Sequence, residues 1–100
     1  MSENQAVTFS SADRLYTFGV WVEEIGLCIR RLREYKEENV MLDVPAFLNL
    51  HLSCGMNDQF SEMKKMWQSF SEEEQPGWYS LQQLNRDKAE LEELSGIPLG

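Results

Sequence analysis

The sequence predicts an all-α protein, a small bundle of three to four helices with a long, largely buried N-terminal helix. Apolar residues recur at helical spacing in three separate stretches, and capping signals bound the last of these stretches. The chain has 100 residues, of which 42% are apolar, enough for one packed domain. Residues 1–9 are expected to form a loose tail and residues 10–100 a single helical domain.

The first helix is expected over about residues 11–38. Apolar side chains recur there at spacings of 3, 4, 3, 4 and 3, which is typical of a heptad seam. Two glycines follow this seam seven residues apart, and each costs about 1 kcal/mol relative to alanine inside a helix. We interpret them as points where another backbone approaches closely. The residues predicted to form this self-association seam are Leu15, Phe18, Gly19, Val22, Ile25, Gly26, Ile29 and Leu32.

Apolar residues of the first helix also lie outside the seam, at Tyr16, Val20, Trp21, Leu27 and Cys28. A single interface needs fewer apolar residues than this, and a helix that is apolar around most of its circumference is typically buried. The sequence therefore predicts a homodimer in which the first helices of two copies pair.

Residues 39–44 are expected to connect two helices, because Asp43 can cap a helix and Pro45 fits a first helical turn. Residues 46–54 are ambiguous, since their apolar side chains alternate as in a strand. A lone strand cannot satisfy its own backbone groups, and leucine rather than β-branched residues fills this stretch. A helix is favoured, and a strand remains the alternative.

Residues 58–70 again show helical spacing. The last helix begins at a capping box, because Ser80 is followed three residues later by Gln83. It is expected to end before Gly96, a residue suited to a left-handed C-cap. The expected apolar stripes of these two helices consist of Phe60, Met63, Trp67 and Phe70, and of Leu81, Leu84, Leu91 and Leu94.

Composition argues against several classes of protein. The chain holds 17 acidic and 9 basic side chains, a net charge of −8, which opposes direct binding of nucleic acid. No stretch has the roughly 20 apolar residues of a membrane span, so no membrane association is expected. The first residues lack a signal-peptide pattern, and a cytoplasmic location is expected. Two cysteines are too few for a disulfide scaffold.

The sequence shows no motif of an enzyme, such as a glycine-rich phosphate loop or a Gly-x-Ser-x-Gly elbow. His51, Cys54 and Cys28 are only three possible metal ligands, and zinc normally takes four or three plus water. Both cysteines are expected to be buried, unreactive thiols. A non-enzymatic protein is therefore predicted, with no catalytic residue, no cofactor and no metal.

Acidic residues gather in the second half of the chain, in one loop and near the end of the last helix. Anions at a helix C-terminus are disfavoured by its dipole, which suggests a selected surface. Trp78, beside the acidic loop, is a possible apolar anchor. The predicted partner-binding residues are Glu72, Glu73, Glu74, Trp78, Glu90, Glu92 and Glu93.

These features predict a small acidic protein that docks on a basic surface of a partner protein and blocks it. The expected partner is a protein that handles nucleic acid, because phage-encoded inhibitors, bacterial immunity proteins and DNA mimics share this profile of size, charge and helicity. The alternative is a self-associating adaptor or chaperone, in which the heptad seam of the first helix is the working surface.

Overall fold

A computed structural model describes residues 11–100, and over this range the chain is all-α with four helices, as predicted. They are α1 (Ser11–Glu37), α2 (Val44–His51), α3 (Gln59–Ser69) and α4 (Leu81–Ser95). The predicted tail, residues 1–9, lies outside the described residues. None of the described helices combines the length and the apolar character needed to span a membrane.

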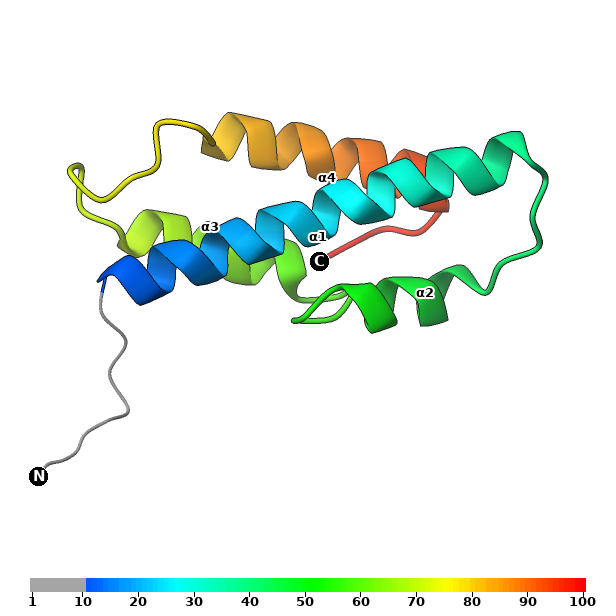
Figure 1. Cartoon of the computed structure of the whole chain (residues 1–100), viewed down its shortest axis with the longest axis horizontal. Coiled ribbons are helices and arrows are strands. Elements are labelled where there is room, and N and C mark those ends of the chain that lie inside the picture. The colour runs from blue at the N-terminus through cyan, green and yellow to red at the C-terminus, as the bar shows by residue number, and fades with distance from the viewer. Residues whose placement is uncertain (1–10) are drawn as a thin grey trace, which may run out of the picture.

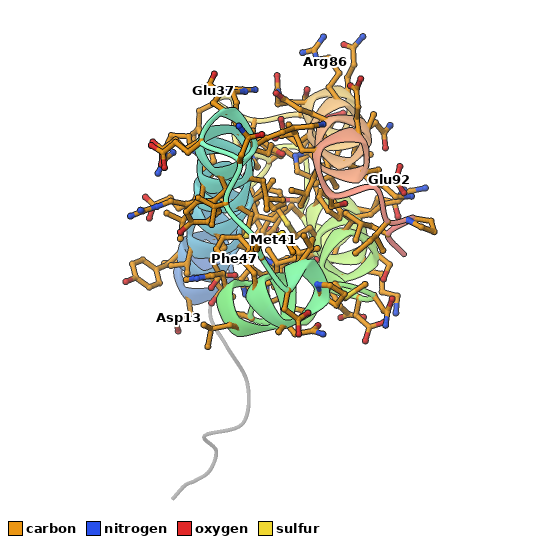
Figure 2. The ribbon with its side chains drawn as sticks, turned by 90° about the vertical axis from the view of Figure 1, so that its right-hand side faces the viewer. Asp13, Glu37, Met41, Phe47, Arg86 and Glu92 are labelled. Carbon is orange, nitrogen blue, oxygen red and sulfur yellow. The ribbon has the colours of Figure 1, made fainter. Side chains whose placement is uncertain are left out.

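The long helix α1 is the central element of the bundle. Helices α4 and α3 pack along it, and the shorter α2 lies beside its C-terminal half (Figure 1). Viewed end-on, the side chains fill the space between the helices, while Glu37 and Arg86 lie at the periphery (Figure 2). One core cluster thus draws on all four helices.

The core contains most of the predicted apolar stripes. In α1, Phe18 and Ile25 are fully buried, and Ile29 and Leu32 nearly so. Val22 is only half-buried at the edge of the same core. The two later stripes also contribute buried residues, namely Phe60, Met63, Leu84 and Leu91 within α3 and α4, and Phe70 just after α3.

Local sequence signals explain where the later helices begin and end. The Asp43 carboxylate accepts a hydrogen bond from the backbone N–H of Ala46 and caps α2. Ser80 accepts one from the backbone N–H of Gln83 at the start of α4, as predicted. The Gln83 side chain does not complete a capping box, because its carbonyl oxygen accepts a hydrogen bond from Arg86 instead of from the backbone N–H of Ser80. Gly96 ends α4 in the left-handed conformation, with φ 73°.

Residues 46–54, the ambiguous segment, are helical as far as His51, so the helix interpretation is confirmed for most of the segment. Leu48 and Leu52 are buried, one helical turn apart, whereas Leu50 is 78% exposed. The strand-like alternation of apolar residues therefore included Leu48 and Leu52, which are four residues apart and so lie on the same side of the helix. Leu52 adopts an extended conformation and ends the helix. The prediction of a helix was therefore wrong for residues 52–54.

A polar network fastens the connection between α2 and α3 onto α1. The side chain of Gln59 is fully buried, and its carbonyl oxygen accepts a hydrogen bond of 2.8 Å from the backbone N–H of Cys54. Its amide donates to Glu24 at 2.9 Å. Glu24 also accepts from the backbone N–H and the hydroxyl of Ser53. Glu24 is thus half-buried and holds this connection against α1.

Within residues 11–100, no backbone from another element approaches Gly19 or Gly26, so close approach at these glycines by a second copy stays a prediction. A Cβ atom at Gly19 would meet only the ring edge of Trp78, at 3.7 Å. At Gly26 it would meet only the guanidinium of Arg30, at 3.5 Å. Both distances are ordinary van der Waals contacts, so neither glycine is required by the fold of this chain.

Gly19→Ala and Gly26→Ala are accordingly expected to raise the free energy of unfolding, each by up to about 1 kcal/mol, because alanine is the better helix former. Urea denaturation monitored by circular dichroism measures this change. If Gly19→Ala lowered the free energy of unfolding while Gly26→Ala did not, Trp78 would have to pack on α1 more closely than the 3.7 Å distance implies.

Candidate functional site

An apolar groove lies on the outer face of α1, in its first half. It encloses about 510 Å³ between α1 and the side chain of Trp78. Trp78 is 58% exposed and Tyr16 is 75% exposed, and both line this groove. The remaining lining residues are Ala12, Leu15, Gly19, Val20 and Glu23.

The loop between α3 and α4 places Trp78 over α1. Pro76 and Tyr79 are buried on either side of it, so the loop is fixed at both points. The Trp78 ring packs against Phe18, with 6.2 Å between ring centroids, and its edge lies beside Gly19. Trp78 is therefore held at its inner edge while most of its surface stays accessible.

The aromatic residues behind Trp78 form a rigid base. Phe18 contacts Phe70 and Tyr79 edge-to-face, with ring centroids 6.0 Å and 5.8 Å apart. The Tyr79 hydroxyl donates a hydrogen bond to Asp87, and the Tyr79 carbonyl accepts one from the indole of Trp67 at 3.3 Å. Burial, followed by the hydrogen bond to Asp87, raises the pKa of Tyr79 well above its usual range. Such a base lowers the conformational entropy that a partner must remove from the site on binding.

The acidic loop beside Trp78 divides into accessible and structural residues. Glu72 and Glu73 are exposed. Glu74 is half-buried, and its carboxylate accepts a hydrogen bond from the backbone N–H of Ser71 at 2.8 Å. It also lies 3.7 Å from the guanidinium of Arg14. The loop therefore offers Glu72 and Glu73 to a partner, and Glu74 shapes the loop.

The second predicted acidic group lies elsewhere. Glu90 is the tenth residue of α4, about 14 Å along the helix from its start, and pairs with Arg33 of α1. Glu92 accepts a hydrogen bond of 2.7 Å from the backbone N–H of Leu99, and Glu93 is exposed. The unfavourable position of Glu92 at the helix end thus has a structural reason, because it holds the buried Leu99 against the bundle. The structure does not bring this group together with the loop.

The predicted self-association seam is largely occupied by the chain's own core. Phe18, Ile25, Ile29 and Leu32 are buried among the other helices, so pairing of first helices along this line requires the bundle to open. Two other seam residues, Leu15 and Gly19, line the outer groove instead. The homodimer itself stays a prediction.

The cysteines are not arranged for chemistry in the described residues. Cys28 is fully buried and Cys54 half-buried, and residues 11–100 contain no cluster of His, Cys, Asp or Glu that could hold a metal ion. Burial, with a smaller effect of Glu24, raises the pKa of the Cys28 thiol from 9.0 to about 11. Burial and then Glu62 also raise the pKa of Cys54. Both shifts favour the unreactive thiol form.

The Cys28 shift predicts a loss of stability in alkali. Its folded-state pKa lies above the unfolded value, so the folded chain keeps a proton that the unfolded chain has released. The free energy of unfolding is therefore expected to fall as pH rises from 9.0 to about 11. Tyr79 acts in the same direction above its ordinary pKa of 10.0. Urea denaturation of Cys28→Ala across this interval should show a shallower fall, and an unchanged slope would contradict this assignment.

Sequence reasoning missed the groove as a site, although it had singled out five of the lining residues for other reasons, namely Leu15, Tyr16, Gly19, Val20 and Trp78. Tyr16 and Val20 stood out as apolar positions outside the seam, and the sequence offered no way to tell a buried face from an exposed one. The signal was this surplus of apolar residues on α1. The structure places Tyr16 and Val20 on the outer face beside Trp78, whereas Cys28 is fully buried and Trp21 packs against the core.

Comparison of the chain with protein-family models, with curated proteins and with solved structures finds no match.

Proposed function

We propose that the chain is a small acidic, non-enzymatic binding protein that docks on a basic surface of a partner protein and blocks it. One observation carries the proposal. Trp78 is 58% exposed on a rigid aromatic base, and the exposed Glu72 and Glu73 precede it in the same loop. Binding hot spots typically combine a large aromatic anchor with a surrounding polar rim.

The net charge of −8 supports a basic partner. Long-range attraction between an acidic protein and a basic surface speeds encounter, and like-charged proteins are repelled. Proteins that handle nucleic acid carry basic surfaces to neutralise phosphates. We therefore propose a partner of this kind, with the chain acting as an inhibitor of the immunity or phage anti-host type.

The proposal is tested by capture of the partner from a lysate of the organism that encodes the chain. The partner is then purified, and its dissociation constant is measured for the wild type and for Trp78→Ala. Loss of an anchor of this type is expected to raise the dissociation constant about thirtyfold, equivalent to about 2 kcal/mol, mainly through faster dissociation.

Leu50→Ala is the matched control, because Leu50 is a large apolar residue that is 78% exposed on α2, away from the groove. It should leave the dissociation constant unchanged. Equal affinity of the wild type and Trp78→Ala for every captured protein would contradict the proposed site.

A further inference from the structure

The first half of α1 carries two apolar faces. One faces the core, through Phe18 and Ile25. The other lines the outer groove, where residues Ala12, Leu15, Gly19 and Glu23 follow each other three or four positions apart. Spacing of three and four residues forms a single stripe along a helix. Within residues 11–100, this outer stripe is flanked by Trp78 but left open to solvent.

The shape of the stripe suits a helix as its occupant. From Ala12 to Glu23 it rises by about 16 Å, or three helical turns. Gly19 lies within this stripe, and a Cβ atom there would have one neighbour within 4 Å, the ring edge of Trp78. A second helix can therefore approach α1 closely, at the short end of the usual interaxial distances of about 8–10 Å. An added strand needs a free sheet edge, which the described all-α chain does not offer.

Charge identifies the kind of helix. Glu23 lies at one end of the groove, and the exposed Glu72 and Glu73 belong to the loop that carries Trp78. That loop lies at the same end of the molecule as the first half of α1 (Figure 1). A second copy would bring its own carboxylates, and a net charge of −8, against Glu23 and the acidic loop. Lysine and arginine on the flanks of an incoming helix would instead complement it.

We propose that the groove binds an amphipathic helix of the partner, with an apolar face between flanks of lysine and arginine. This inference rests on the proposed function, since it names the part of the partner that is held. Tyr16 and Trp78 would cover the two sides of the bound helix, and Gly19 would lie beneath it.

The test uses two helix-constrained peptides of about 14 residues with identical apolar faces, one flanked by lysine and the other by glutamate. Fluorescence anisotropy of the labelled peptides gives their dissociation constants for the full chain. The lysine peptide is expected to bind at least about tenfold more tightly than the glutamate peptide, and its affinity should fall as salt is added.

Tyr16→Ala and Gly19→Leu are each expected to weaken binding of the lysine peptide at least about tenfold, by removing a wall and by filling the groove. Leu50→Ala is the matched control and should bind as the wild type does. Tyr16 is 75% exposed, so its removal tests the groove even if Gly19→Leu impairs folding, which circular dichroism will show.

Four results would overturn the inference. The two peptides could bind equally, or the lysine peptide could bind Tyr16→Ala as it binds the wild type. Sedimentation could also reveal a dimer of the wild type that Tyr16→Ala dissociates, which would assign the groove to a second copy. If a purified partner depends on Trp78 but binds Tyr16→Ala and Gly19→Leu normally, the helix inference fails and the proposed function stands.

Discussion

Replacing Ile25 with alanine is expected to lower the free energy of unfolding by about 2–5 kcal/mol. Ile25 is fully buried at the centre of α1, in the core shared by all four helices. The substitution removes apolar contacts and leaves a cavity that the surrounding helices fill only in part. Because domains of this size are stable by only about 5–15 kcal/mol, the loss is a large fraction of the whole. Urea denaturation monitored by circular dichroism measures it.

Leu50→Ala provides the control, because it removes the same number of carbon atoms from a side chain that is 78% exposed. Its effect should stay within about 0.5 kcal/mol, as is usual for surface positions. If Ile25→Ala also changed the free energy of unfolding by less than about 0.5 kcal/mol, the side of α1 that carries Ile25 would not face the core.

Replacing the buried Gln59 with methionine is expected to lower the free energy of unfolding by about 1–3 kcal/mol. Methionine matches the length of glutamine but can neither accept from the backbone N–H of Cys54 nor donate to Glu24. Buried polar groups that lose their partners retain the full penalty of their desolvation. The α2–α3 connection would keep its hydrogen bonds from Ser53 to Glu24 but lose the link through Gln59.

Gln68→Met is the matched control, because Gln68 is an exposed glutamine on the same helix. Its effect should be within about 0.5 kcal/mol. A Gln59→Met variant as stable as the wild type would mean that water, rather than Gln59, satisfies these groups. Thermal or urea denaturation of the two variants side by side decides this point.

The fold could be predicted largely from periodicity and caps. The heptad positions Phe18, Ile25 and Leu32 are in the core because the spacing of α1 places them on one face. Ser80 and Gly96 cap α4 because their side-chain and backbone preferences act locally. Local rules of this kind need no knowledge of the other helices.

The polar core could not be predicted, because it depends on which segments meet. Gln59 belongs to a polar sequence, and only the packing of the α2–α3 connection against α1 buries it with Glu24. The same applies to Cys28, which lies outside the heptad seam but is fully buried between α1 and its neighbours. The spacing of apolar residues in the sequence identifies the apolar face of each helix. It does not identify which other elements pack on that face.

The candidate site was predictable in part. The loop carrying Trp78 is chemically distinctive, and its tryptophan and two of its three glutamates are accessible, as a binding role requires. Glu92 and Glu90 resemble the loop residues in sequence, yet one holds Leu99 and the other pairs with Arg33. Intramolecular partners of this kind distinguish a structural carboxylate from an available one, and only the folded chain reveals them.

The central claim is that Trp78 and the adjacent carboxylates form the surface that meets a basic partner. The most direct test compares association rates of the purified partner with Glu72→Lys/Glu73→Lys and with Glu37→Lys/Glu38→Lys, over a series of salt concentrations. Glu37 is exposed at the C-terminal end of α1 (Figure 2), and Glu38 is exposed directly after it. Both double variants change the net charge by the same amount. The account predicts slower association and a weaker salt dependence for the loop variant than for the control. Equal rates and equal salt slopes for the two variants would contradict it.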